Sequence, residues 1–348
     1  MTYRTLLVLL GVAALAGCPE PEKDEPVDDT DTGPDAPDVW TTVASGLAGA
    51  VLSITGTSAD DVWLVGSQGN GPVPTLIHWD GAAWDTIDTS GHLGDYWWGW
   101  AASEDDLWIA GAGGRVRRYQ RSTDTWTMDD TTAENLTLFG IWGSSASDVW
   151  AVGGDIALGF SAAWHYDGTA WELVDVPDEA DAAGAIYKVW GRSADDVWMV
   201  GSAGLAMHWD GAAWTVTPTG VTTTLFTVNG DLDGTDVWAV GGQGNSVVLR
   251  WDGAAWIDET PPFTQTIPGI FGDGAKPRAA GYGGSIYVRE GDAWALDPRG
   301  QAGFFDFHVV WEDDEGGVWG GGGVIASNPT RDGQVVYGGT NPPTVYAP

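Results

Sequence analysis

The sequence predicts an all-β protein: a seven-bladed β-propeller with four-stranded antiparallel blades. Three observations support this prediction. From Trp40 onward, a unit of 38–48 residues repeats seven times, a period typical of propeller blades. Six units carry an Asp-x-Trp or Gly-x-Trp landmark, and six carry a later tryptophan that follows a turn. An isolated β-type segment, "WTTVAS" at residues 40–45, precedes the first full unit.

The first 17 residues have the pattern of a secretory signal peptide. Arg4 is followed by an apolar run over residues 5–16, which is too short to cross a bilayer as a helix. The sequence "LAGC" at residues 15–18 resembles a bacterial lipobox, and this resemblance implies cleavage before Cys18 and a lipid on its sulfur. An ordinary signal peptide with a stray cysteine is the alternative. Because the chain has no other cysteine, we expect no disulfide.

Residues 18–39 are predicted to be the lipidated cysteine and a disordered tether. Within residues 19–38 there are nine carboxylates, one lysine and five prolines, which leave too little apolar surface for a core. In the Gram-negative lipoproteins that this N-terminus resembles, an aspartate after the cysteine retains the protein at the inner membrane. Pro19 stands there instead. We therefore expect export and a lipid anchor in the outer membrane or at the cell surface.

The propeller itself is expected to span residues 40–348. Each unit predicts four short strands, A to D from the inside outward, such as "VLSITG", "DVWLVG", "LIHWD" and "AAWDTI" in the first unit. The hexapeptide "WDGAAW" occurs at residues 79–84, 209–214 and 251–256, and its Asp-Gly pair predicts a tight turn between strands C and D. The seventh unit lacks strand D. Residues 40–45 would supply it, closing the ring and covering a sheet edge.

The repeat resembles the kelch-type propellers. Strand B ends in Gly-Gly at residues 153–154 and 241–242, an aromatic-Asp turn follows, and a tryptophan comes next. The segment "RYQRSTDTW" at 118–126 is the most similar copy. The "SADDVW" turns also resemble those of Asp-box propellers, although here the turn precedes strand B. The resemblance covers residues 40–348 and implies architecture only, because kelch-like propellers share no single activity.

Most aromatic and imidazole side chains fall at repeated positions, which favours a packing role. Twenty of the 23 tryptophans do so, including the four of strand A, and an indole buries a large apolar area between blades. Three histidines share one position in strand C, which also favours structure. The residues in these two groups are Trp40, Trp63, Trp79, Trp84, Trp100, Trp108, Trp126, Trp142, Trp150, Trp171, Trp190, Trp198, Trp209, Trp214, Trp238, Trp251, Trp256, Trp294, Trp311 and Trp319, with His78, His165 and His208. Trp97 and Trp164 align with apolar residues of other blades and are also expected in the core.

Trp98 breaks the repeat, because its position holds small or polar residues in every other blade except one. It lies near the start of a strand A, and we expect the ligand site on the face formed by the D-to-A and B-to-C loops. A plug that fills the channel is the alternative role for Trp98. The candidate ligand-binding residues on and around this face are Trp98, Tyr96, His92, Asp95, Lys188, Tyr187, Asp306, His308, Phe304 and Phe305.

Composition argues against several functions. The chain has a formal net charge of −35, which repels nucleic acid, and no basic stripe with aromatics is present. Histidine and acidic clusters with metal-ligand spacing, Gly-x-Ser-x-Gly and Gly-rich loops before helices are absent from the sequence. We therefore expect no cofactor and no catalytic residue. No sequence motif supports the binding of calcium by the acidic loops.

The function predicted from the sequence is that of a monomeric, membrane-anchored scaffold that binds a protein or a glycan of the cell envelope. A glycosidase or lyase is the first alternative, with Asp95 and Asp306 facing each other across the channel mouth. A structural component of the envelope is the second.

Surface display can be tested by adding protease to intact cells. If the propeller is tethered outside the outer membrane, proteolysis within residues 19–38 releases it into the medium, because extended acidic segments are accessible to proteases. Immunoblotting of cells and medium measures the release. Complete protection on intact cells, with cleavage after lysis, would refute surface display.

Overall fold

The computed structural model describes residues 39–131, 136–155, 159–262, 265–273, 276–325 and 327–348. The predicted signal peptide, Cys18 and all of the tether except its last residue lie outside the described residues. No helix in these ranges is long and apolar enough to span a bilayer.

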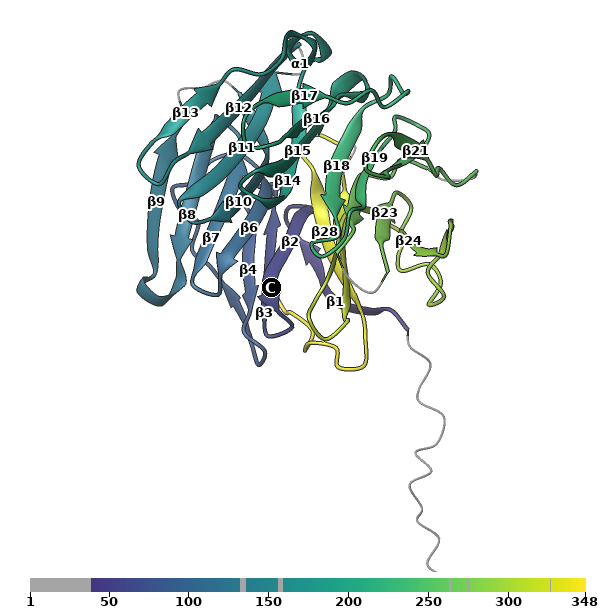
Figure 1. The fold of residues 1–348 in the computed structure, drawn as a ribbon. Helices are drawn as coiled ribbons and strands as arrows, with labels where there is room; N and C mark the ends of the chain where they lie inside the picture. The colour runs from purple at the N-terminus through teal and green to yellow at the C-terminus, as the bar shows by residue number, and fades with distance from the viewer. Residues whose placement is uncertain (1–38, 132–135, 156–158, 263–264, 274–275, 326) are drawn as a thin grey trace, which may run out of the picture. The chain divides into compact units, whose positions relative to one another are not determined.

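Seven four-stranded antiparallel sheets form the fold, as predicted, and Figure 1 shows them arranged in a ring. Blade 1 contains β2 (Val51–Ser58), β3 (Asp61–Gly66), β4 (Leu76–Trp79) and β5 (Trp84–Thr86). Blade 2 contains β6 (Tyr96–Ser103), β7 (Asp106–Gly111), β8 (Arg115–Gln120) and β9 (Thr125–Asp130). Blade 3 contains β10 (Thr137–Ser145), β11 (Asp148–Asp155), β12 (Phe160–Tyr166) and β13 (Trp171–Val174). Blade 4 contains β14 (Ile186–Ser193), β15 (Asp196–Gly201), β16 (Ala206–Trp209) and β17 (Trp214–Val216).

The remaining blades follow the same order. Blade 5 contains β18 (Leu225–Gly230), β19 (Val237–Gly241), β20 (Val247–Trp251) and β21 (Trp256–Asp258). Blade 6 contains β22 (Gly269–Phe271), β23 (Arg278–Gly281), β24 (Ser285–Glu290) and β25 (Ala293–Leu296). Blade 7 contains β26 (Asp306–Glu312), β27 (Val318–Val324), β28 (Arg331–Gly338) and β1 (Thr41–Leu47). The first strand of each blade contacts that of the next blade, and β26 contacts β2, so the ring is closed.

The N-terminal strand completes the last blade, which confirms the predicted closure. In Figure 1 the purple β1 runs beside the yellow β28. The two strands pair antiparallel, with Thr41 opposite Tyr337 and Leu47 opposite Gly333. The Val43 and Leu47 side chains of β1 are buried in the core of blades 7 and 1. The chain therefore seals its own ring by non-covalent contacts alone.

Adjacent blades are joined by tryptophans of strands D and B. The D-strand indole of one blade meets the B-strand indole of the preceding blade edge to face, with ring centroids 5.3–6.3 Å apart. This geometry is favoured by the aromatic quadrupole. The five pairs are Trp84–Trp319, Trp171–Trp108, Trp214–Trp150, Trp256–Trp198 and Trp294–Trp238. The packing role predicted for these tryptophans is confirmed.

The junction between blades 6 and 7 uses cations instead. Arg278 replaces the B-strand tryptophan of blade 6, and its guanidinium donates to Asp297 and Glu312 at 2.9 Å each. Arg299 lies 5.0 Å from the Trp40 ring and also bonds Asp297. A hydrogen-bonded network can hold a junction only where each buried charge is paired, and here each is.

The strand C histidines pair with strand B aspartates, so their predicted structural role is confirmed. His78 Nε2 lies 2.6 Å from Asp61 Oδ1, and its ring lies 4.1 Å from the Trp63 ring. The same arrangement recurs at His165 and His208, and arginine takes the position at 118 and 250. Burial opposes ionisation of Asp196, but hydrogen bonds from His208 and Arg192 lower its pKa to about 2.

The repeated "WDGAAW" segment forms the turn between strands C and D. Asp80 Oδ1 accepts the backbone N–H groups of Ala82 and Ala83, which lowers the pKa of this carboxyl. Gly81 has a φ of +84°, a conformation that side chains with a Cβ disfavour. The copies at Asp210 and Asp252 make the same bonds. The motif is therefore architectural.

Three elements of the fold were not predicted. One is a short helix, α1 (Asp178–Ala183), between blades 3 and 4, and two are single 3₁₀ turns, η1 (Arg121–Thr123) and η2 (Ser202–Gly204). The C-terminal segment also contacts both sides of the ring closure, in blades 7 and 1. The backbone N–H of Tyr346 donates to Val43 O at 2.7 Å, and Trp84 Nε1 donates to Thr344 O at 2.6 Å.

Removal of residues 40–45 should collapse stability, because it deletes most of β1 and exposes the edge of β28. A point variant makes the same test. Val43→Asp places an unpaired charge in the core and should cost about 3–5 kcal/mol of unfolding free energy, measured by urea denaturation.

Ser45→Asp is the matched control, because Ser45 is exposed on the same strand and the change should stay within about 0.5 kcal/mol. An unchanged melting temperature after the deletion would contradict the closure.

Candidate functional site

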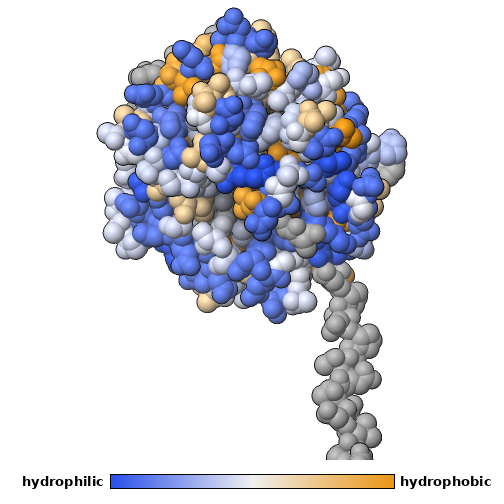
Figure 2. Space-filling model, in the orientation of Figure 1, coloured by the Kyte–Doolittle hydropathy of each residue, from blue (hydrophilic) through white to orange (hydrophobic). Residues whose placement is uncertain are grey.

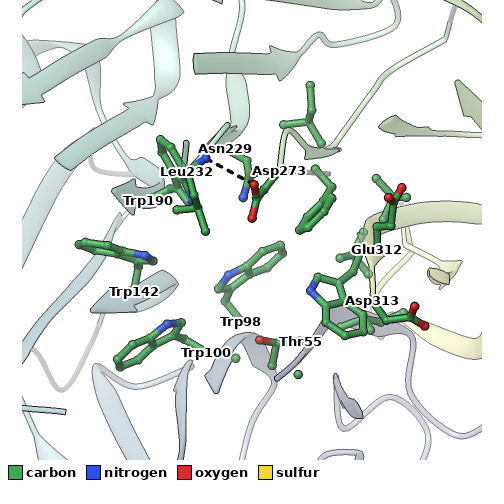
Figure 3. Close-up of a pocket in the computed structure, with 18 of the residues that line it drawn as sticks. Thr55, Trp98, Trp100, Trp142, Trp190, Asn229, Leu232, Asp273, Glu312 and Asp313 are labelled. Atoms are coloured by element: carbon green, nitrogen blue, oxygen red, sulfur yellow. Dashed lines mark hydrogen bonds between the residues drawn. The ribbon is translucent and has the colours of Figure 1, made fainter. Parts of the chain in front are cut away.

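A cavity of about 830 Å³ lies among the inner strands, at the end where strands A turn into strands B. Figure 3 shows the side chains that line it. Its walls come from all seven blades: Thr55 on β2, Trp98 and Trp100 on β6, Trp142 on β10, Lys188 and Trp190 on β14, Asn229 on β18, Phe271 on β22 and Trp311 on β26. This end of the channel is opposite to the D-to-A loop face on which the sequence-based prediction placed the site.

The four tryptophans at the repeated strand A position, Trp100, Trp142, Trp190 and Trp311, have two roles. Each indole packs over a glycine of the next blade, so close that a Cβ added at Gly143 would lie 2.7 Å from Trp100, and one at Gly191 would lie 2.6 Å from Trp142. Trp190 and Trp311 meet Gly230 and Gly56 in the same way. The predicted packing role is confirmed. The same indoles also line the cavity, which the prediction missed.

In two blades a polar residue replaces the tryptophan. Thr55 Oγ1 accepts the backbone N–H of Ala101 at 3.3 Å, and Asn229 Oδ1 accepts that of Gly272 at 2.7 Å. Both bonds cross to the next blade. The ring of indole walls is therefore open at blades 1 and 5. Trp311 and Trp100 lie on either side of the first gap, and Trp190 and Phe271 on either side of the second.

Trp98 and Lys188 form the inner end of the cavity. The Lys188 ammonium nitrogen lies 3.3 Å from the centroid of the Trp98 ring, although blade 3 lies between their blades, so the contact crosses the channel. The same nitrogen donates to Phe139 O at 3.2 Å. The alternative role for Trp98, a plug, therefore fits its position, and its indole also lines the cavity. Burial lowers the pKa of Lys188 well below its ordinary value.

A second aromatic tier lies beyond this plug. A β-bulge in strand A lets two successive side chains face the channel, as Trp97 and Trp98 do. Trp97, Phe139, Tyr187 and Phe226 contact one another in order from blade to blade, with ring centroids 5.1–5.4 Å apart. Burial raises the pKa of Tyr187. None of these four side chains lines the cavity.

His308 belongs to this second tier. Its ring lies 6.4 Å from Trp97 and 6.3 Å from Trp98. Its Nδ1 lies 2.6 Å from Leu52 O, so this nitrogen carries the proton and donates it. The His308 side chain is partly buried. Burial and the Lys188 charge lower the pKa of His308 to about 3.

The mouth of the cavity is acidic. Its lining contains five acidic residues, Asp273, Glu312, Asp313, Asp314 and Glu315, and one basic residue, Lys188. Figure 3 shows Trp100, Trp142 and Trp190 on one side of Trp98, and Glu312 and Asp313 on the other. Asp313 accepts hydrogen bonds from backbone N–H groups and from Trp319 Nε1. Glu312 accepts a hydrogen bond from Arg278.

Among the acids that line the cavity, Asp273 is the one whose negative charge is least balanced by nearby hydrogen-bond donors and cations. Burial raises its pKa, and repulsion from Asp231, Asp233 and Glu312 raises it further. Its one hydrogen bond among the described residues is long, 3.4 Å from the Leu232 backbone N–H, and is the dashed line in Figure 3. No ion pair involves Asp273 in the part of the chain that the structure describes.

Several predicted site residues make contacts within the fold and do not line the cavity. Tyr96 is completely buried, and its hydroxyl bonds His92, which is also buried. Desolvation lowers the pKa of His92. Asp95 accepts the backbone N–H of Gln68 at 2.9 Å, and Asp306 that of Gly283 at 3.0 Å. Both carboxylates thus hold loops of a preceding blade.

Phe304 and Phe305 form a separate exposed feature in the loop before β26. Phe304 is 92% exposed and Phe305 36%. Elsewhere, on the face shown in Figure 2, hydrophilic side chains cover most of the surface and apolar ones form small separate patches. Of the ten predicted residues, only Trp98 and Lys188 line the cavity.

The described residues contain no group of three or more His, Cys, Asp or Glu side chains that could hold a metal ion. The prediction of no cofactor remains a prediction.

The innermost position of strand A in each blade could have indicated that its repeated tryptophans line a cavity. Repetition favours packing, but strand A is the innermost strand of every blade, so a repeated side chain there also converges on the axis. Asp273 carried no such signal, since the A-to-B loop of blade 6 departs from the repeated "SADDVW" sequence.

The comparisons with known proteins bear on the fold alone. No family model matches the chain, and no characterised protein matches it significantly by sequence. Among solved structures, the chain is similar to "YCF48 bound to D1 peptide", with a TM-score of 0.51 and 13% identity over 83% of this chain and 80% of that one. The match supports the propeller. The likeness to kelch-type and Asp-box propellers stays a resemblance.

The His308 pKa predicts a pH dependence of stability. Its folded pKa, about 3, lies below the unfolded value of 6.5, so the unfolded chain binds the proton more readily between these values. As pH falls through this window, the wild type should lose up to about 1.4 kcal/mol per pH unit relative to His308→Asn. Asparagine can keep the bond to Leu52 O without titrating. Parallel urea-denaturation curves from pH 7 to pH 4 that stay at a constant offset would disprove the assignment.

Proposed function

We propose that this protein is an exported, lipid-anchored propeller that binds a segment of another protein in its central cavity. The observation that carries the proposal is the cavity itself: open indole faces and carboxylates converge on about 830 Å³ of space. Concave sites with aromatic walls and a few polar groups are typical of ligand recognition. The structurally similar YCF48 propeller was solved with a peptide bound, which provides a precedent for this architecture.

The carboxylates that the sequence suggested for catalysis do not lie in this cavity. A glycosidase needs two free carboxylates that face the substrate. The pair suggested by the sequence, Asp95 and Asp306, is engaged with backbone N–H groups. Scaffolding of envelope proteins is compatible with the binding role, and localisation by Cys18 to the outer membrane or cell surface is part of the proposal.

A glycan is the second candidate ligand. Indole faces beside carboxylates also suit the stacking and hydrogen bonding of a sugar ring. A protein segment is favoured because an apolar loop side chain, Leu232, lies at the cavity mouth and is 52% exposed. A glycan array probed with the wild type tests the alternative directly.

Selection of random peptides displayed on phage tests the proposed function. Peptides enriched on the propeller should bind in the cavity, so Trp142→Ala should weaken the binding at least about tenfold, as for an interface tryptophan. Isothermal titration of resynthesised peptides gives the affinities, and the melting temperature of each variant reports on folding.

Phe304→Ala is the matched control, because it removes an exposed aromatic residue outside the cavity. Binding that survives Trp142→Ala but is lost in Phe304→Ala would place the site on the loop before β26 and refute the cavity.

A further inference from the structure

We infer that the side chain held in the cavity is a lysine or an arginine of the partner protein. The inference rests on the proposed function and names its ligand chemistry. The cavity combines two groups that recognise organic cations, open indole faces and uncompensated carboxylates, in one concave space.

The indoles can accept a cation. Trp100, Trp142 and Trp311 are partly exposed in the cavity, and in the described chain no aromatic ring or cation stacks on them. Ammonium and guanidinium groups are attracted to indole faces, and the attraction grows as water is excluded. Across the channel, the Lys188 nitrogen already lies 3.3 Å from the centroid of the Trp98 ring.

The carboxylates of the cavity favour a ligand with a positive charge. Asp273 faces three other acids and no described cation, and the repulsion that raises its pKa is relieved when a positive group enters. Glu315 also lines the cavity without a described ion pair. The one basic group in the lining, Lys188, is already engaged with Phe139 O and with Trp98 at the inner end.

The cavity is therefore polarised along its depth. A basic side chain that enters at the mouth passes the acidic loops of blades 6 and 7 and lies against the indoles of blades 2 to 4 before it reaches Lys188. An acidic side chain would meet the carboxylates first.

The charge of the whole chain favours the same partner. A formal net charge of −35 attracts basic segments over distances set by ionic strength and repels acidic ones. Such steering acts on the rate of association. The open indoles then select the side chain that can stack.

The test uses the peptides selected on the wild-type propeller. We expect them to be enriched in lysine or arginine. Each basic residue is then replaced by its neutral counterpart, Nε-acetyllysine or citrulline, which keeps the length of the side chain. For the residue that enters the cavity, neutralisation should weaken binding about tenfold or more, and added salt should weaken the parent peptide but not the neutral one.

Two variants of the propeller complete the experiment. Asp273→Asn should weaken the parent peptide about tenfold and leave the neutral peptide unchanged. Asp292→Asn removes the same unit of charge at a fully exposed turn outside the cavity and should have little effect. Melting temperatures confirm that both variants fold.

The outcomes of these experiments distinguish this inference from the proposed function on which it rests. Peptides that lose affinity in Trp142→Ala but keep it after neutralisation would overturn the basic ligand and leave cavity binding intact. Peptides that are indifferent to Trp142→Ala would overturn both. Equal effects of Asp273→Asn and Asp292→Asn would also overturn the inference, because only long-range charge would then be at work.

Discussion

The contact between an indole of one blade and an indole of the preceding blade is the interaction on which this propeller depends. A single four-stranded sheet cannot bury both of its faces, so each blade is stable only against its neighbours. Five of the seven junctions use this edge-to-face pair, at centroid separations of 5.3–6.3 Å. The strands, the turns and the closing strand β1 keep these indoles in register.

The same repetition builds the cavity. In a ring of blades, a position repeated in an outer strand stays at the periphery, whereas a position repeated in the innermost strand approaches its own copies at the axis. The strand A indoles of Trp100, Trp142, Trp190 and Trp311 therefore pack on the next blade with one part of the ring and face the cavity with another. Structural and functional roles are not alternatives at such positions.

Residues that deviate from the repeat make the two ends of the cavity different. Trp98 crosses the channel to Lys188 and closes one end. Thr55 and Asn229 replace indoles and bond the next blade instead. The loops of blades 6 and 7 add acids at the other end. A symmetric scaffold thus acquires one closed end and one open, acidic mouth.

The number of blades, the order of the strands and the closure by residues 40–45 could be predicted from the sequence, because they follow from a repeat and from turn residues that act locally. It also assigned the strand C histidines correctly, since a position repeated in several blades must be satisfied within each blade. The folded chain alone shows which end of the channel is hollow, that Tyr96 and His92 are buried, and that Asp273 lines the same cavity as the strand A indoles. These facts depend on contacts between residues far apart in the chain, and the local pattern of a repeat carries no information about where its copies converge.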